Sequence, residues 1–541
     1  MNVKPKLIKL FLLCVTITTS NSLSIMNTRV RSPMFQKVSA TASSTRSRNT
    51  SLSANNNDKK KVAIIGGGIA GLSCASHLAS LHNSRFEPTV FDTGRLRPGG
   101  RCSSRLPGDK TKHRNENQNR ILNSFVIDHA AQILTVNHND NSGEYSEFVK
   151  QVQQWEKDDI VKEFPSGSVV EILKDLRGSN KNKNENQSSI SRPFIRTVKT
   201  QSKMYYGVNG MGSIPAAIAY PKHQKDKTEE SEPQFQIHQD VWISPSNGVK
   251  FIGSTKLPKW KVQTNGKNYG TYDAIVIAHN GKCADRLMSR TPAKALHSLL
   301  RTNFNANVQA WGGKKMTLNS IYSLSIAIKK DGSPLSNNGM LKEDVISAFI
   351  KNEPTLRFIT CQTRKFGNNN DDTIEVWTIL SSATFAKKHK GPQENLPNEK
   401  VQEVTDLMLE ALGKSLGLQS GTLHQGMVLD SRLQLWGAAV PLNRWRWNDN
   451  NEKDGDENSK RVHSNNESPL MENGFVFDAE HGVGACGDWL LDPSIGGAWE
   501  SGRRLSNWFQ HAEDQSAGLP PDGGAFQVSK AATGSGIGNV R

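Results

Sequence analysis

Three glycines near the start of the chain have the spacing of a phosphate-binding turn. They follow an apolar run at 61–66 and form the pattern Gly66-x-Gly68-x-x-Gly71. The first permits a tight turn, the second lets a phosphate approach the backbone, and the third lets the next helix pack closely. That helix, which includes Ala70, directs free N–H groups and partial positive charge toward phosphates. The pattern predicts a dinucleotide site.

An acidic residue adds the context that makes this pattern specific. The stretch 89–92 has the composition of the next strand and ends at Asp92, 26 residues after Gly66. A carboxylate at this place can accept hydrogen bonds from ribose hydroxyls. Glycine spacing alone is a weak signal, but a strand, a glycine turn, a helix and a following acid together favour a dinucleotide.

A second glycine pair, Gly99-Gly100-Arg101, resembles the FAD-binding amine-oxidase superfamily. The resemblance implies that both glycines let the backbone lie against FAD and that Arg101 supports the FAD-binding loop. No cysteine is placed for the covalent flavin link of monoamine oxidases, so the resemblance implies non-covalent FAD. A surface turn is the alternative interpretation of this segment.

Motifs near the other end of the chain are similar to the same superfamily. In that family the acid of a Gly-Asp pair, here Asp488, binds the ribityl or pyrophosphate part of FAD, and the next helix points its N-terminus at the flavin. The resemblance places Ala498 and Trp499 on this helix, where Trp499 also has the spacing of a packing residue. It also places the backbone of Val241 against the adenine.

Four further segments resemble the renalase-like branch of the superfamily. They are Asp128–Gln132, Tyr206–Gly212, Glu375–Ser382 and Arg444–Trp447. The resemblance covers about residues 61–510, apart from insertions. The chain departs from the pattern at Ala130, where glycine is usual, and at His279, where the family often has proline.

The resemblance gives three pocket candidates and a reaction. The candidates are His129, Gln132 and Trp445, with a core histidine, a polar strand residue and a packing tryptophan as the structural alternatives. The expected reaction takes a hydride from an amine or a reduced nicotinamide-type donor onto flavin, with O2 as acceptor and H2O2 as product. The alternatives are a plastid carotenoid desaturase or protoporphyrinogen-oxidase relative and a non-catalytic flavin-binding sensor or scaffold.

The elements that must position these residues can be read from hydrophobic periodicity. A helix is predicted at 69–82 and another at 399–416, a buried parallel strand at 274–278, and an antiparallel sheet from β-rich stretches between 320 and 385. The predicted fold class is therefore α/β. It combines a Rossmann-type, glutathione-reductase-like FAD-binding domain with a second α+β substrate domain built on an antiparallel sheet.

The predicted organisation is discontinuous. The FAD-binding domain takes residues 61–140, 205–290 and 470–510; the substrate domain takes 141–204 and 291–469; and 511–541 is a disordered tail. Polar Asn/Lys-rich blocks at 108–120, 174–192, 221–234 and 448–468 are interpreted as surface insertions.

The first sixty residues are predicted to be a targeting sequence. They carry ten Lys or Arg against one acid, which is +9 of the net charge of +17. A basic start, a short apolar run at 10–17 and an acid-free, Ser/Thr-rich stretch at 23–57 predict a signal peptide followed by a transit-like segment. We expect plastid import, with secretion or the ER lumen as the alternative.

The remaining charge and the cysteines argue against a nucleic-acid partner, a disulfide framework and a metal site. The other +8 is spread over the chain without a basic stripe or a recognition motif, so no nucleic-acid partner is expected. The six cysteines are scattered and form no CxxC pair, so neither a disulfide framework nor a metal site is expected. The apolar run of the leader is too short to span a bilayer, and the mature chain is expected to hold no stable transmembrane segment.

Overall fold

The structure is a computed structural model, and contacts group residues 57–541 into one compact unit. It describes residues 59–80, 85–109, 120–138, 143, 145–173, 193–221, 234–264, 266–304, 316–335, 341–367, 372–393, 395–423, 426–447, 473–519 and 526–530. Apart from Lys59 and Lys60, the predicted targeting sequence lies outside the described residues. Most residues of the predicted insertions also lie outside them.

A six-stranded sheet is assembled from three distant parts of the chain. Its strands, in spatial order, are β10 (Gln236–His238), β2 (Phe86–Phe91), β1 (Lys60–Ile65), β14 (Ala274–Ile277), β23 (Val483–Cys486) and β22 (Phe475–Asp478). All neighbours pair in parallel except β22, which is antiparallel to β23. This is the Rossmann-type α/β sheet that the sequence predicted.

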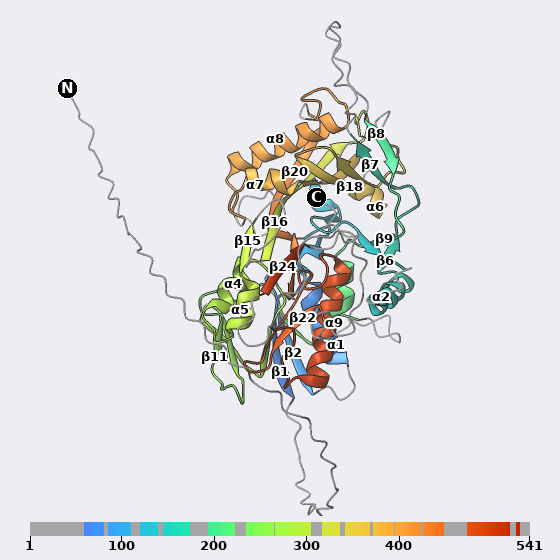
Figure 1. The fold of residues 1–541 in the computed structure, drawn as a ribbon. Coiled ribbons are helices and arrows are strands. Elements are labelled where there is room, and N and C mark those ends of the chain that lie inside the picture. The colour runs from blue at the N-terminus through green and yellow to red at the C-terminus, as the bar shows by residue number, and fades with distance from the viewer. Residues whose placement is uncertain are drawn as a thin grey trace, which may run out of the picture. The chain divides into compact units, whose positions relative to one another are not determined.

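Two helices cover one face of this sheet. Val62 and Ile64 of β1 pack against α1 (Ile69–Ser80) and α9 (Ile495–Ala512). The two helices lie side by side in Figure 1. A Cβ atom on Gly502 would come 2.1 Å from the carbonyl oxygen of Ala70, so glycine is required for this close approach. The C-terminal helix is thereby fixed against the first helix of the fold.

An antiparallel meander covers the other face. It consists of β11 (Val249–Phe251), β12 (Trp260–Thr264) and β13 (Lys267–Tyr272), joined there by α4 (Lys282–Ser289) and α5 (Lys294–Leu300). Ala63 and Ile65 of β1 point into this second core, as the alternation of side chains along a strand requires. Trp260 of β12 is fully buried here.

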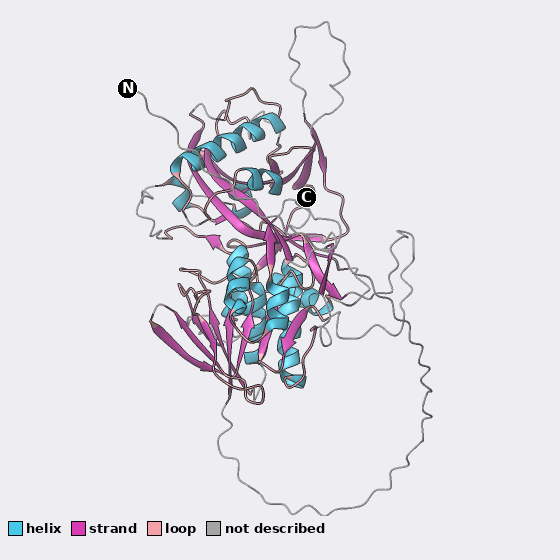
Figure 2. Ribbon diagram, turned by 60° about the vertical axis from the view of Figure 1, so that its left-hand side comes forward, coloured by secondary structure: helices cyan, strands magenta, loops and turns pink. Residues whose placement is uncertain are grey.

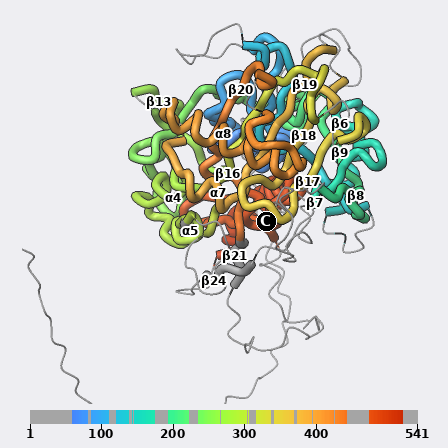
Figure 3. The backbone as a smooth tube through the Cα atoms, turned by 90° about the horizontal axis from the view of Figure 1, so that it is seen from above, coloured from blue at the N-terminus to red at the C-terminus, as the bar shows by residue number. Residues whose placement is uncertain are grey.

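An eight-stranded, mainly antiparallel sheet forms the next layer. Its strands are β15 (Thr302–Phe304), β16 (Met316–Lys329), β19 (Ile374–Ser381), β18 (Leu356–Cys361), β17 (Ser347–Lys351), β7 (Val169–Leu173) and β8 (Phe194–Thr197), with β20 (Val428–Pro441) paired to β16. Figures 2 and 3 show this sheet from two further sides. The predicted β-rich stretches between 320 and 385 are strands of this sheet, whereas β7, β8 and β20 were not predicted.

Three helices accompany the eight-stranded sheet, either packing on it or following one of its strands. They are α6 (Gln362–Phe366), α7 (Ala383–Lys388) and α8 (Asn398–Ser415). Val404, Met408 and Leu412 of α8 share a core with Leu324 and Ile326 of β16. The predicted helix at 399–416 is α8, and its apolar stripe faces the sheet.

Short elements connect the two sheets. They are η1 (Gly100–Cys102), β3 (Ser104–Arg105), η2 (Ile121–Ser124), β4 (Ile127–Asp128), β5 (Leu134–Val136), α2 (Ser146–Lys157), β6 (Val161–Glu163), β9 (Lys203–Gly207) and α3 (Ser213–Ala219). The buried carboxylate of Glu500 in α9 accepts from the backbone N–H of Phe148 at 3.1 Å, in the first turn of α2. One buried acid therefore joins α2 to the C-terminal helix.

The predicted disordered tail contains structure. His511 and Ala512 complete α9, Ala517 forms a bridge with Phe477, and β24 (Phe526–Lys530) pairs with β21 (Asn443–Trp447). Backbone pairing with strands distant in sequence gives these segments structure that local composition does not predict. The division into two domains at the predicted boundaries stays a prediction. Within the described residues, no helix is long and apolar enough to cross a membrane.

Candidate cofactor site

The glycine turn lies between β1 and α1, at the carboxyl edge of the parallel sheet. Gly66 has a φ of +119°, which favours glycine. A Cβ on Gly71 would come 2.0 Å from the carbonyl oxygen of Gly66, whereas a Cβ on Gly68 would meet nothing within 4 Å. Gly71 is therefore a packing glycine, and Gly68 faces open space where a phosphate can approach.

The second glycine pair lies directly on the first turn. The N–H of Gly99 donates to the carbonyl oxygen of Gly67 at 2.7 Å, and Gly99 forms a bridge with Gly68. Both Gly99 and Gly100 have positive φ, +141° and +55°. The structure thus brings together the two glycine motifs, and a Cβ on Gly100 would lie 3.6 Å from the Cα of Gly68.

Arg101 joins this loop to the C-terminal motif. Its Nη2 donates to Asp488 Oδ1 and its Nη1 lies near Asp488 Oδ2, both at 2.8 Å, and Nη1 also donates to the carbonyl oxygen of Ala439. A paired geometry of this kind fixes both side chains. Two residues 387 positions apart therefore form one ion pair beside the glycine turns.

Asp92 lies at the end of β2, beside the glycine turn. Its Oδ1 accepts from the N–H of Gly67 at 3.3 Å, and the side chain is buried. Burial raises the pKa of Asp92, while the Gly67 N–H partly offsets this effect. The N–H of Val241, in the loop after β10, donates to the carbonyl oxygen of Asp92 at 2.9 Å. The predicted ribose and adenine residues are therefore neighbours.

Three buried polar atoms without a partner follow the carboxyl ends of strands in this sheet. Asp92 Oδ2 comes after β2, Asn280 Nδ2 three residues after β14, and Trp489 Nε1 three residues after β23. Ligands of open α/β sheets bind at this edge. We call the edge formed by these residues with Gly68, Gly100 and Asp488 the cofactor crevice. Unmet polar atoms beside an open glycine turn fit a polar, phosphate-bearing dinucleotide.

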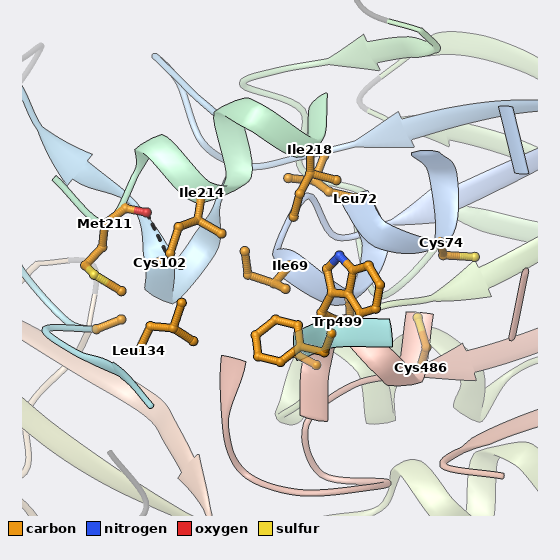
Figure 4. Packing of buried hydrophobic residues seen from close by; sticks show 14 of the residues in the cluster. Ile69, Leu72, Cys74, Cys102, Leu134, Met211, Ile214, Ile218, Cys486 and Trp499 are labelled. Carbon is orange, nitrogen blue, oxygen red and sulfur yellow. Dashed lines mark hydrogen bonds between the residues drawn. The ribbon is translucent and has the colours of Figure 1, made fainter. Parts of the chain in front are cut away.

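The helix after Asp488 has a capped first turn, and the side chain of Trp499 packs in the core. Ser494 caps α9 by accepting from the N–H of Gly497 at 2.9 Å. Ala498 and Trp499 are both buried. The Trp499 ring lies 5.1 Å from that of His77, in the core between helices (Figure 4). The structural alternative for Trp499, packing, is the one its contacts support.

Cys486, next to Gly487-Asp488, lies in the same core as Cys74 (Figure 4). Both side chains are fully buried, and the hydrogen bond with the Cys486 thiol, together with burial, raises the pKa of Cys74. A buried thiol with a raised pKa is unreactive. Both cysteines act as small core residues.

His129 lies against the second glycine loop. Its Nε2 is 3.1 Å from Ser103 Oγ, and its ring stacks on Trp436 of β20 with centroids 5.4 Å apart. Burial, with smaller contributions from Arg105 and Arg432, lowers the pKa of His129 to about 3. The imidazole is therefore neutral at physiological pH, and its buried Nδ1 has no partner.

Gln132 belongs to a buried hydrogen-bond network. Its Nε2 donates to the carbonyl oxygen of Asp128 at 2.6 Å, and its Oε1 accepts from Gln362 Nε2 at 2.9 Å. Lys365 Nζ donates to Asp128 Oδ2 and to the carbonyl oxygen of Gln132, both at 2.7 Å. We call Asp128, Gln132, Gln362 and Lys365, with Thr378, the buried network. Its contacts favour the structural alternative for Gln132, and a substrate role stays a prediction.

Lys365 and Asn280 are the residues that sequence reasoning missed. Lys365 is buried among the rings of Phe164, Tyr206 and Phe366, and burial lowers its pKa. Nothing in the local sequence Gln362–Phe366 distinguishes it from a surface lysine. For Asn280 a signal existed, because it stands where the family's loop differs from this chain. The side chain of the third pocket candidate, Trp445, lies outside the described residues.

Comparison with known proteins adds a family match for the first segment. A model of the NAD(P)-binding Rossmann-like domain matches residues 64–152. This match supports the dinucleotide-binding fold predicted from the glycine turn. No curated protein matches the chain.

Among solved structures, the chain is similar to three forms of putrescine oxidase. A double mutant has 11% identity and a TM-score of 0.41, and the wild type bound to putrescine and a triple mutant each have 10% and 0.40. In each case the similarity covers 83% of this chain and 98% of the other. At this identity and TM-score the likeness gives no guide to the substrate.

Proposed function

We propose that this protein is an FAD-dependent oxidoreductase of the renalase-like, amine-oxidase type. The carrying observation is the ion pair between Arg101 and Asp488, which closes one crevice from motifs at both ends of the chain. An NAD(P)-binding domain alone needs neither the second glycine loop nor a distant acid beside it. The proposal extends the dinucleotide match at 64–152 to a complete flavin site.

We propose a role toward one part of FAD for each residue of the cofactor crevice. Gly66, Gly68 and Gly71 with the N-terminus of α1 would hold the pyrophosphate, Asp92 a ribose, and Val241 the adenine edge. Gly99, Gly100 and Arg101 would line the loop over the cofactor, and Asp488 would bind its ribityl or pyrophosphate part. Cys74, Cys102 and Cys486 are buried in the core of this part of the fold, whereas Cys283 at the start of α4 is exposed. We propose that the cofactor is non-covalent.

The residues of this chain would supply orientation and electrostatics. When bound, FAD supplies the hydride acceptor, with O2 as the final acceptor and H2O2 as the product. The N-terminus of α9 would stabilise negative charge that develops near it. His129 and Trp436 form a neutral wall beside the Gly100 loop, where an amine or a reduced nicotinamide-type ring would lie.

A donor screen tests this proposal. The purified protein is mixed anaerobically with NADH, NADPH, benzylamine or putrescine while the visible flavin absorbance is followed. We expect one donor class to bleach the flavin and air to restore the colour with release of H2O2. A colourless protein that does not bind added FAD would refute the cofactor assignment. A yellow protein that no donor bleaches would favour the flavin-binding sensor or scaffold instead.

We further propose that the protein is imported into a plastid, because residues 1–60 combine a signal-like start with a transit-like stretch. Fusing residues 1–60 to a fluorescent protein tests this. A signal in the ER or outside the cell would favour secretion, and a cytosolic signal would refute both destinations.

A further inference from the structure

The contacts of Ser103 determine which nitrogen of His129 carries the proton. Ser103 Oγ donates to the carbonyl oxygen of Gly100 at 2.7 Å, and it lies 3.1 Å from His129 Nε2. A serine hydroxyl has one hydrogen, and a carbonyl oxygen can only accept. Both contacts are hydrogen bonds only if His129 donates its Nε2–H to Ser103. Nδ1 of a neutral His129 is then an unprotonated acceptor.

The neighbourhood of His129 keeps the ring uncharged and in place. Burial is the largest cause of its lowered pKa, and the charges of Arg105 and Arg432 add to it. The ring stacks on Trp436, whose Nε1 donates to the carbonyl oxygen of His129 at 3.1 Å. The residue before it, Asp128, is held by Lys365 inside the buried network.

The position of His129 relates it to the cofactor crevice. Through Ser103 it is linked to Gly100, where an added Cβ would lie 3.6 Å from the Cα of Gly68. The ring is only partly buried as a whole, while Nδ1 itself is out of contact with solvent and has no partner. A buried acceptor that no protein group satisfies is unfavourable unless another molecule supplies a donor.

We propose that His129 is a specificity-determining residue whose Nδ1 accepts a hydrogen bond from an N–H or O–H group of the small molecule bound beside the flavin. The inference rests on the proposed function in taking that molecule to be the hydride donor. It requires a donor that presents a hydrogen-bearing nitrogen or oxygen near the reacting carbon. Ser103 is the positioning residue, because it acts through His129.

The tautomer can be measured without turnover. In a proton–nitrogen correlation spectrum of the ¹⁵N-histidine-labelled holoprotein, the His129 signals are assigned by their loss in His129→Phe. We expect Nε2 to be protonated and Nδ1 unprotonated in the wild type. Ser103→Thr should preserve this pattern because it keeps the hydroxyl, whereas Ser103→Ala should give a mixture of tautomers. A proton on Nδ1 in the wild type overturns the inference.

The donor is then tested with the same panel, NADH, NADPH, benzylamine and putrescine, while both the Nδ1 resonance and the flavin absorbance are followed. A molecule that shifts Nδ1 and bleaches the flavin supports both proposals. Bleaching with no Nδ1 shift overturns the role of His129 and leaves the proposed function standing. An Nδ1 shift without bleaching supports the role and counts against the proposed function. No shift and no bleaching overturn both.

Two variants separate the acceptor from the ring. His129→Phe keeps an aromatic ring for Trp436 and loses the nitrogen, so the dissociation constant of the bound molecule should rise about tenfold. His129→Asn can place an amide oxygen near the position of Nδ1, so its loss should be smaller. Equal affinity of wild type and His129→Phe would overturn the inference.

Discussion

The cofactor crevice and the buried network lie close together but differ in how completely their polar atoms are satisfied. In the network, Asp128 Oδ2 binds Lys365 while Oδ1 accepts from Ser104 Oγ and from the N–H of Met211. In the crevice, Asp92 Oδ2 and Asn280 Nδ2 are buried without a partner. Both regions contain buried polar atoms, so burial alone does not distinguish them.

The difference indicates which region holds the fold and which awaits a ligand. A buried polar group without a partner costs about 1–3 kcal/mol. A network in which every polar group has a hydrogen-bond partner avoids this free-energy cost, and it fixes the loops that it joins. Asp128 joins α6 of the eight-stranded sheet to the segment after the second glycine loop. In the crevice, the polar atoms without partners lie at the carboxyl ends of the strands. A bound dinucleotide that supplied hydrogen-bond partners there would remove their free-energy cost.

The largest expected effect is at Gly68. Its Cβ position is open, so Gly68→Val should leave the fold intact while a branched side chain fills the path of the pyrophosphate. We expect a protein that purifies without flavin, with an unfolding midpoint equal to that of the wild-type apoprotein. Asp488→Ala should weaken flavin retention less. Full flavin in Gly68→Val would contradict the cofactor site.

The second effect is at Lys365, in the satisfied region. Lys365→Met leaves the buried Asp128 carboxylate without its charge partner and should cost about 3–5 kcal/mol of unfolding free energy, measured with urea. The double variant Lys365→Met/Asp128→Asn removes both charges and should recover a large part of that loss. If the single and double variants are equally destabilised, the pair is not the source of the effect.

A third test sharpens the comparison, because Asp92→Asn should act in opposite directions on stability and binding. Burial raises the pKa of Asp92 in the fold, so its contribution to apoprotein stability is full below the unfolded-state pKa and is lost as pH rises through the folded-state pKa. At neutral pH the variant apoprotein should therefore be more stable. Its FAD affinity should fall at least about tenfold, since a charged acceptor is lost.

Thermal unfolding of the apoprotein across pH, with flavin titration in parallel, measures both effects of Asp92→Asn. The pH-dependent loss of stability should disappear in the variant. A variant that is less stable at neutral pH and binds FAD normally would assign Asp92 to the fold rather than to the cofactor.

The smallest effect is expected at Asn280. Asn280→Ala removes one unmet donor, so FAD affinity should fall by about fivefold to tenfold while the apoprotein keeps its stability or gains slightly. Asn247→Ala, at an exposed turn before β11, is the matched control and should change neither quantity. An unchanged dissociation constant for FAD in Asn280→Ala would place Asn280 outside the binding surface.

Local patterns were sufficient for the elements that carry the glycine turn. The spacing of Gly66, Gly68 and Gly71, the helix after them and the strand before Asp92 all occur where the sequence placed them. Each depends on contacts within about thirty residues, where periodicity and glycine geometry dominate. Trp499 shows the limit, because helical spacing alone could not say whether its ring meets the cofactor or, as its contacts show, His77.

By itself, the sequence determined a Rossmann-type turn and a set of motifs at both ends of the chain, because these depend on backbone conformation and short-range packing. Only the tertiary structure decided that Arg101 meets Asp488, that Lys365 is a buried partner of Asp128, and that His129 Nε2 lies 3.1 Å from Ser103 Oγ. The physical reason is that charge pairing, burial and a histidine's tautomer are properties of neighbours in space. In this chain those neighbours come from segments as far apart as 387 residues.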